Sequence, residues 1–186
     1  YLAEALPYPL DTIARGWGSK KSQAEVIKEV PFMEEMNTEL LKVTGLKGQY
    51  KLLIDDQEIG TWDAADLAKG INLAAESKTP QYQQALTIMH LNEYRWELER
   101  TFREYAWCQF GFFQQKGLLF ANDRQAIKVM DENLEKNGWL KGHRDGYTRM
   151  MSDAVREARE QEMDVLINKI YEINKPVVRK ILLRKI

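Results

Sequence analysis

The sequence predicts a mainly helical α+β fold, in which long antiparallel helices follow a small β-hairpin unit and a C-terminal strand closes the chain. Three observations predict it. Residues 40–62, LLKVTGLKGQYKLLIDDQEIGTW, alternate apolar and polar side chains between turn-forming residues, which is typical of strands. After Pro80 the apolar residues recur every three or four positions, which is typical of amphipathic helices. The last ten residues, VVRKILLRKI, favour a terminal strand, with a helix as the alternative.

Residues 1–30 are expected to form an irregular lead-in and a short helix. Ser22 is followed three residues later by Glu25, which is the spacing of a capping box at a helix start. The helix that begins there has to end before Pro31, because the residue before a proline is disfavoured in the α conformation.

Residues 31–78 are expected to form a β-hairpin subdomain. We expect a first strand near residues 41–45, a second over 50–54 and a third over 58–62, with a tight turn at 55–57. Because an isolated hairpin is marginal in water, this unit has to pack on another surface.

A short helix and an apolar clip complete this subdomain. Asp63 is a suitable N-cap for the helix AADLAK, and Gly70 suits the position that follows its last turn. The next four residues, INLA at 71–74, are expected to be extended.

Residues 79–176 are expected to form the helical region. Thr79 is a suitable N-cap and Pro80 a suitable first helical residue. The long helix that starts there is predicted to break near Gly111 or Gly117.

Two further helices are predicted after that break. One begins at Asn122 or Asp123 and is closed by Asn137–Gly138, and the other covers about residues 147–174. Residues 177–186 then form the terminal strand or tail.

Composition excludes several classes of function. The chain has 186 residues, with 27 Lys and Arg against 28 Asp and Glu. It therefore lacks the positive electrostatic potential that attracts a nucleic-acid backbone. No apolar run approaches the ~18 residues of a membrane span, and the first residues do not resemble a signal peptide. Cys108 is the only cysteine, which excludes an internal disulfide and a cysteine-based zinc site.

Neither the serines nor the histidines stand in a catalytic pattern. No serine lies in G-x-S-x-G or Gly-Asp-Ser, the settings that expose a nucleophile beside backbone donors. Ser22 and Ser152 lie at or near expected helix starts, where capping explains them. His90 falls inside the long helix and His143 in an expected polar loop, residues 141–146. We therefore expect no catalytic residue, and an autonomous enzyme that uses either histidine is the last-ranked hypothesis.

Metal and cofactor sites are not expected either. The stretch HLNEYRWE places His90, Glu93 and Glu97 on one helical face, but a di-metal bundle needs the reverse order, Glu-x-x-His, on two helices. No glycine-rich loop has the spacing that holds a phosphate or a dinucleotide.

The richest run of aromatic side chains, from Tyr94 to Phe113, covers more than one face of the long helix. Core packing explains part of it. The remainder is able to contact a second protein surface or a sugar.

Several segments resemble a known family. VPFMEEMNTELLKVTGL, YKLLIDDQEIGTW, DLAKGINLA and TPQYQQA resemble, in this order, the region after the catalytic domain in a group of bacterial SGNH (GDSL-like) hydrolases. IYEINKP resembles the closing stretch of that region, with Lys175 at a usual glutamine and Asp56 at a usual turn glycine. The resemblance extends from about Leu6 to Pro176 and is strongest over residues 31–84.

The resemblance implies a C-terminal portion without catalytic residues. The family's serine lies in a Gly-Asp-Ser block, and its aspartate and histidine lie in an Asp-x-x-His block; this sequence contains neither. It implies a non-catalytic accessory module that braces an SGNH catalytic domain or shapes its substrate cleft. The implied partners are that domain and an acylated carbohydrate, and the implied location is the periplasm or the exterior.

Three residues of the matching segments are candidates for binding or for shaping the cleft: Asn37, Trp62 and Asn72. The two asparagines can hold loops through side-chain hydrogen bonds. Trp62 can pack in a core or stack on a sugar. The alternative hypothesis is an independent helical module that binds a protein through its aromatic helix.

Overall fold

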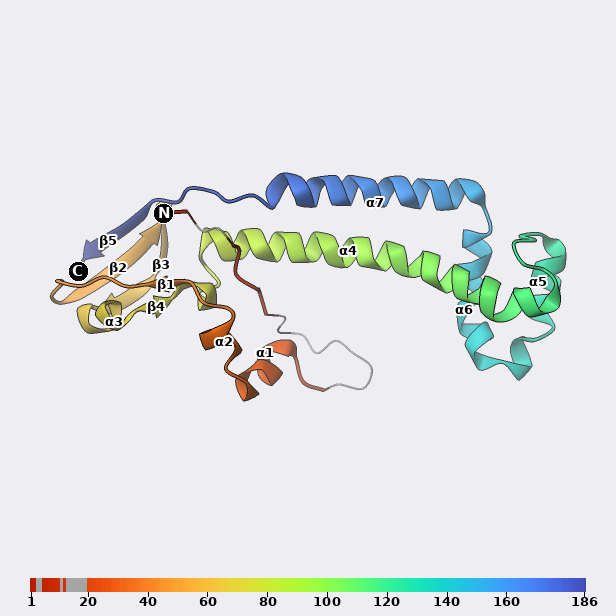
Figure 1. The fold of residues 1–186 in the computed structure, drawn as a ribbon, viewed down its shortest axis with the longest axis horizontal. Helices are drawn as coiled ribbons and strands as arrows, with labels where there is room; N and C mark the ends of the chain where they lie inside the picture. Colours follow the sequence, from red (N-terminus) through yellow and green to blue (C-terminus); the bar gives the residue numbers. More distant parts are fainter. Residues whose placement is uncertain (3–4, 11, 13–19) are drawn as a thin grey trace. The chain divides into compact units, whose positions relative to one another are not determined.

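The computed structural model describes residues 1–2, 5–10, 12 and 20–186, so part of the expected lead-in lies outside the described residues (Figure 1). The chain divides into two compact units. Unit 1 comprises Tyr1–His90 and Glu172–Ile186, and unit 2 comprises Leu91–Tyr171. No helix in the described part of the chain is long and apolar enough to cross a membrane.

Unit 1 contains the strands and the short helices, and it shares the two long helices with unit 2. Its elements in chain order are α1 (Gln23–Val26), η1 (Ile27–Glu29), α2 (Phe32–Glu35), β1 (Leu40–Leu41), β2 (Gln49–Ile54), β3 (Gln57–Asp63), α3 (Ala64–Lys69), β4 (Ile71–Asn72), η2 (Leu73–Ala75), the start of α4 (Pro80–Cys108), the end of α7 (Asp153–Ile173) and β5 (Ile181–Lys185).

The predicted capping box is confirmed at the start of α1. The backbone N–H of Ser22 donates to Glu25 Oε2 at 2.7 Å, and the backbone N–H of Glu25 donates to Ser22 Oγ at 3.3 Å. The helical segment ends before Pro31, as predicted.

The predicted hairpin is confirmed as β2 and β3, and the predicted terminal strand as β5. The sheet is antiparallel in the order β3-β2-β5, with Leu52 opposite Leu183. Asp55 and Asp56 form the turn with left-handed φ values of 49° and 66°. Asp55 accepts hydrogen bonds from the Lys180 backbone and from Arg179, and these bonds lower the pKa of its carboxyl group.

The expected first strand near residues 41–45 is confirmed only at Leu41. β1 covers only Leu40–Leu41 and pairs with β4 in a separate two-stranded sheet. The second edge of β2 is taken by β5, which lies about 130 residues later in the chain. Strand propensity identifies an extended segment but not its partner, so local pattern could not make this choice.

The helix α3 is confirmed, and Gly70 follows it with φ at 111°. The side chain of Leu40 lies against Gly70, where a Cβ atom would be 2.8 Å from Leu40 Cδ1, and the positive φ of Gly70 favours glycine. Asp63 occupies the N-cap position, although its side chain makes no capping hydrogen bond. The expected extended clip 71–74 is extended only at β4, because residues 73–75 turn into the 3₁₀ helix η2.

The core of unit 1 lies between the β2–β3 hairpin and the segment that contains α3, β4 and η2. Its buried members are Leu52, Ile54, Ile59, Leu67, Ile71 and Leu73. Leu183 and Ile181 of β5 pack against this cluster from the sheet edge.

We predict that Leu183→Ala lowers the free energy of unfolding by about 1.5 kcal/mol, because this half-buried side chain packs on the core. Urea denaturation followed by circular dichroism measures the change. Leu182→Ala is the matched control, since Leu182 belongs to the same strand but is exposed on its other face. An equal loss in the two variants would contradict the placement of β5.

Unit 2 is helical. After most of α4 it contains the π-helical segment η3 (Gln109–Phe113), η4 (Gln114–Lys116), α5 (Arg124–Asp131), η5 (Leu134–Lys136), α6 (Gly138–Met150) and most of α7. The predicted break near Gly111 or Gly117 is confirmed, because α-helix gives way to η3 and η4, and Gly117 adopts a left-handed φ of 68°. The predicted helix start at Asp123 is confirmed by its hydrogen bond from the Ala126 backbone at 2.8 Å.

Three expectations for the later helices differ from the structure. The helix that starts after Asp123 ends at Asp131, and Asn137 closes only the short 3₁₀ helix η5 that follows it. Asn137 also opens α6, where its Oδ1 accepts from the Leu140 backbone at 3.1 Å. His143 therefore lies in a helix and not in a loop, and α7 begins at Asp153 instead of near residue 147. Asparagine suits both helix ends, and the glycines of KGHRDG made a helix look like a loop.

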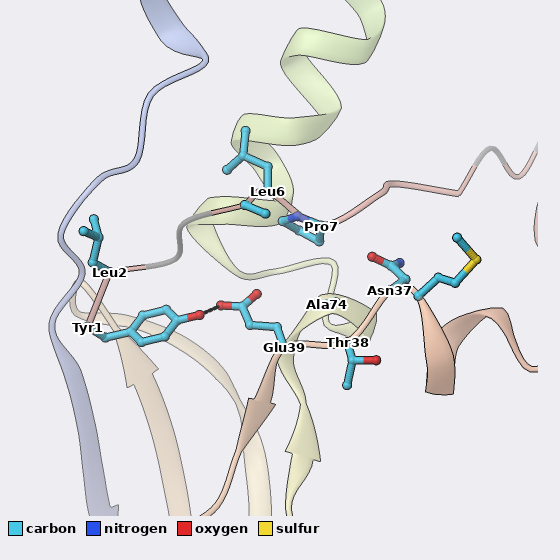
Figure 2. Close-up of a pocket in the computed structure, with 10 residues that line it drawn as sticks. Tyr1, Leu2, Leu6, Pro7, Asn37, Thr38, Glu39 and Ala74 are labelled. Carbon is cyan, nitrogen blue, oxygen red and sulfur yellow. Dashed lines mark hydrogen bonds between the residues drawn. The ribbon is translucent and has the colours of Figure 1, made fainter.

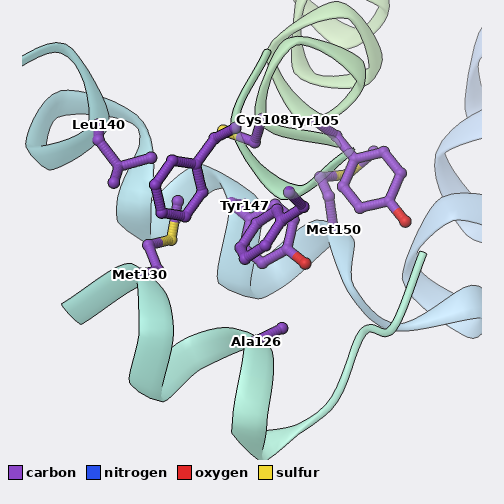
Figure 3. Packing of buried hydrophobic residues seen from close by; sticks show 9 residues of the cluster. Tyr105, Cys108, Ala126, Met130, Leu140, Tyr147 and Met150 are labelled. Atoms are coloured by element: carbon purple, nitrogen blue, oxygen red, sulfur yellow. The ribbon is translucent and has the colours of Figure 1, made fainter. Parts of the chain in front are cut away.

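Nine buried side chains from α4, η3, α5 and α6 form the core of unit 2 (Figure 3). The ring of Tyr147 is at the centre of the aromatic part, with its centroid 4.7 Å from that of Phe113 and 5.6 Å from that of Tyr105. The full set is Tyr105, Cys108, Phe112, Phe113, Ala126, Met130, Leu140, Tyr147 and Met150.

The buried thiol in this core makes stability depend on pH. Burial raises the pKa of Cys108 to about 11, with a smaller contribution from the negative charge of Glu104. An unfolded cysteine ionises near pH ~8.5, so the unfolded state gains stability before the folded one as pH rises. We predict that the free energy of unfolding has its full value below about pH 8. At pH 10 it should be lower by about 1–2 kcal/mol.

Chemical denaturation at the two pH values checks this prediction. Burial also raises the pKa of Tyr147, which works in the same direction, so Cys108→Ala should reduce the pH dependence without abolishing it. A pH dependence that is the same in Cys108→Ala and in the unchanged chain would show that the thiol is not its source.

Candidate functional site

Asn72 connects three segments of unit 1 through its side chain. Its Nδ2 donates to the backbone oxygens of Met33 at 3.0 Å and Asn37 at 2.9 Å. Its Oδ1 accepts from the backbone N–H groups of Glu39 at 2.8 Å and Ala74 at 3.1 Å. These four bonds fix the turn after α2, the strand β1 and the start of η2 against one another.

Asn37 extends this network to the lead-in. It is only 5% exposed. Its Oδ1 accepts from the Tyr8 backbone N–H at 2.8 Å, and its Nδ2 donates to the Tyr8 backbone oxygen at 3.0 Å. The side chain thus pairs with residue 8 as a neighbouring strand would. The structure brings the candidates Asn37 and Asn72 together, while a role in binding stays a prediction.

A cavity of about 340 Å³ opens beside this network (Figure 2). The lead-in forms one side of it, and residues 36–39 with Ala74 form the other. The lining residues are Tyr1, Leu2, Ala5, Leu6, Pro7, Met36, Asn37, Thr38, Glu39 and Ala74.

Glu39 supplies the charge of the cavity. Its Oε1 accepts hydrogen bonds from the Tyr1 hydroxyl and from Gln81 Nε2, the latter at 2.8 Å. Burial raises the pKa of Tyr1, and the hydrogen bond and negative charge of Glu39 raise it further, so this hydroxyl remains a neutral donor.

Two oxygen atoms at this point accept no hydrogen bond from the described residues. They are the buried Oε2 of Glu39 and the Oε1 of Gln81, whose side chain is 2% exposed. Buried acceptors of this kind are rare in proteins, because each costs free energy when it is left unpaired. Only Glu39 also lines the cavity, so its carboxylate is the group that a neutral or cationic donor in the cavity would meet.

Trp62 does not line this cavity. It lies on β3 opposite Tyr50 of β2, and it packs against the core of unit 1. A Cβ atom at Gly60 would come within 2.6 Å of the Trp62 ring, so the ring lies directly over the backbone of its own strand.

The serine and histidine candidates are placed elsewhere. Ser22 belongs to the capping box, and the backbone oxygen of Ser152 accepts the first hydrogen bonds of α7. His143 Nδ1 is 2.8 Å from the Trp139 backbone oxygen, and its ring stacks on Trp139. His90 is exposed on α4. Among the described residues, no three His, Cys, Asp or Glu side chains gather as metal ligands.

Sequence reasoning missed Tyr1, Glu39 and Gln81. One signal was available for Gln81, which occupies the same helical face as Ala85, four residues later, so a polar side chain interrupts a buried stripe. For Glu39 there was no signal, because its partners are distant in sequence.

Comparison with known proteins shows which proteins the chain is similar to. Residues 86–175 match the family described as the diltiazem deacetylase C-terminal helical domain. This part of the chain is similar to the end portion of a deacetylase. A solved structure described as "BT4096 a gut microbial diltiazem-metabolizing enzyme" matches the whole chain with a TM-score of 0.93 and 92% sequence identity. No curated protein matches.

The chain is much shorter than that enzyme. The match includes 100% of this chain but only 42% of the BT4096 chain. More than half of the similar enzyme therefore corresponds to nothing in these 186 residues.

Proposed function

We propose that the chain is the non-catalytic C-terminal accessory module of an ester hydrolase of the SGNH type, and that it braces the catalytic domain or shapes its substrate cleft. The match of residues 86–175 to a C-terminal helical domain of a deacetylase carries this proposal. The 42% coverage of a 92% identical chain supports it, because the similar enzyme has room for a separate catalytic domain.

The proposed division of labour follows from the chemistry. Removing an acetyl group from an ester needs an activated nucleophile, a proton acceptor and donors for the oxyanion. The hydroxyl of Ser22 is engaged by Glu25 at 2.9 Å, and His143 packs between tryptophans. In the proposal the remainder of the enzyme supplies the catalytic groups, and this chain supplies a fixed surface.

The cavity beside Asn37 is the proposed contact with the remainder of the enzyme. Glu39 lines this cavity and its Oε2 has no donor among the described residues, and a covering domain can supply N–H groups or a cationic side chain. The network of Asn72 holds residues 36–39 in place, so this surface is already formed before a partner covers it.

Amide hydrogen exchange tests this contact. The chain is compared alone and as part of a longer enzyme of the BT4096 kind. The proposal expects slower exchange at residues 36–39 in the longer enzyme, because the covering domain protects these amides. Equal exchange in the two would contradict the contact. Glu39→Ala should weaken the protection, whereas Glu58→Ala should not, since Glu58 is exposed and pairs with Lys51.

The alternative, an independent helical module that binds a protein partner, is favoured by the exposed aromatic side chains of α4. It predicts a chain that unfolds cooperatively alone and has no affinity for an SGNH catalytic domain. Binding measurements with such a domain separate the two functions.

A further inference from the structure

In unit 2, α4 and the start of η3 carry large apolar side chains on two opposite faces. The inner face contributes Leu98, Tyr105 and Cys108, which are 5%, 8% and 0% exposed. Trp96, Trp107 and Phe110 belong to the outer face, where they are separated by eleven and three residues, spacings that keep side chains on one side of a helix. A helix that is apolar on two sides is usually covered on both.

Two further rings enlarge this outer surface. Phe120 packs edge-on against Phe110 with the centroids 5.6 Å apart, and Trp139 of α6 joins Trp107 through the ring of His143 between them. We call this surface the aromatic stripe; it consists of Trp96, Trp107, Phe110, Phe120 and Trp139, which are 48%, 52%, 53%, 54% and 43% exposed.

The rings of the aromatic stripe are held in place without a partner. The guanidinium carbon of Arg103 lies 3.9 Å from the ring centroid of Trp96. The rings of Trp139 and His143 stack at 4.4 Å. Side chains that are already ordered lose little conformational entropy when a partner binds, which favours association.

The charges beside the aromatic stripe are compensated within the helix. Arg95 and Arg103 both pair with Glu99, at 2.7 and 3.6 Å, and Arg100 pairs with Glu97 at 2.9 Å. Such a surface does not select a strongly acidic or basic partner. Because each arginine has a carboxylate beside it, two identical copies can approach each other with little net repulsion between like charges.

The area of the aromatic stripe suits a dimer. An aromatic side chain presents about 200 Å², so five rings at about half exposure leave ~500 Å² of exposed aromatic surface. A standard interface buries ~800 Å² on each partner. The stripe is thus large enough to form the apolar centre of an interface, with the neighbouring charged side chains as its rim.

We propose that a second copy of this chain covers the aromatic stripe, so that the protein is a homodimer through unit 2. A two-fold axis that crosses α4 near Arg103 makes the contact self-complementary, because Arg103 lies midway between Trp96 and Phe110. In this arrangement the two helices run antiparallel, and Trp96 of each copy faces Phe110 of the other. The proposal is independent of the chemistry of the parent enzyme.

Sedimentation of the 186-residue chain tests the proposal. The mass should rise from 21.7 kDa towards twice that value as the concentration is raised from about 1 to 100 μM. Trp107→Ala should weaken the dimer by about thirtyfold, since a central tryptophan is the usual hot spot of an interface. The double variant Trp107→Arg/Phe110→Arg should remain monomeric at every concentration.

The matched control is Val165→Arg/Tyr171→Arg, because these α7 side chains are 68% and 69% exposed and lie outside the aromatic stripe. This control should dimerise like the unchanged chain, and far-ultraviolet circular dichroism shows that every variant is folded. A mass of 21.7 kDa at all concentrations overturns the proposal. A dimer that survives the stripe substitutions also overturns it. The proposal also fails if another domain of the same longer chain covers the aromatic stripe.

Discussion

Replacing Gln109 by alanine is expected to lower the free energy of unfolding of unit 2 by about 4 kcal/mol, because the change removes buried hydrogen bonds and leaves a cavity. Gln109 is fully buried. Its Nε2 donates to Asn122 Oδ1 at 2.9 Å, and its Oε1 accepts from the Phe120 backbone at 2.7 Å.

The backbone around these partners explains the size of the effect. Phe120 and Asn122 adopt left-handed φ values of 57° and 47°, which residues other than glycine rarely adopt. Their conformation depends on the hydrogen bonds that they form with Gln109 and on the one that Asn122 Nδ2 donates to the Tyr105 hydroxyl at 2.7 Å. Without Gln109 the loop before α5 is expected to detach from the core.

Urea denaturation and near-ultraviolet circular dichroism measure this prediction. The control is Gln115→Ala, six residues later, where the side chain is exposed. If Gln109→Ala were no less stable than this control, the buried network would contribute nothing to unit 2.

Asn72→Ala is expected to lower the free energy of unfolding of unit 1 by about 3 kcal/mol. The substitution leaves the backbone groups of Met33, Asn37, Glu39 and Ala74 without their partner. The segment that lines the cavity then loses its support, so the effect should extend to exchange of the amides at 36–39.

The comparison for Asn72 is Asn168→Ala, an exposed asparagine on α7. It should change the free energy of unfolding by less than about 0.5 kcal/mol. Asn72→Asp keeps both acceptor bonds but loses both donor bonds, so it should be destabilised as well. A stable Asn72→Asp would mean that the donor bonds to Met33 and Asn37 are dispensable.

Elements with strong local signals could be predicted from the sequence. The capping box at Ser22, the start of α4 at Pro80 and the turn at Asp55 each depend on residues close in sequence. The terminal strand was recognisable because its composition differs from the helices before it. Each of these features is determined by residues that lie within about six positions of one another in the sequence.

Long-range choices could not be predicted. The edge of β2 could accept either the segment at Leu41 or the tail at Ile181, and only packing of the whole unit favours the tail. Asn137 suits the start and the end of a helix equally, and the buried Leu140, Tyr147 and Met150 decide that α6 begins there. The same limit applies to the site, where Glu39 meets Tyr1 and Gln81 from distant positions.

The most direct test of the accessory role is hydrolysis of a short acyl ester, such as p-nitrophenyl acetate, by the purified 186-residue chain. The account predicts a rate no higher than that of the same chain after unfolding, because in the proposed accessory role the remainder of the enzyme supplies the catalytic groups. Turnover that a serine-directed phosphonate abolishes would contradict the account.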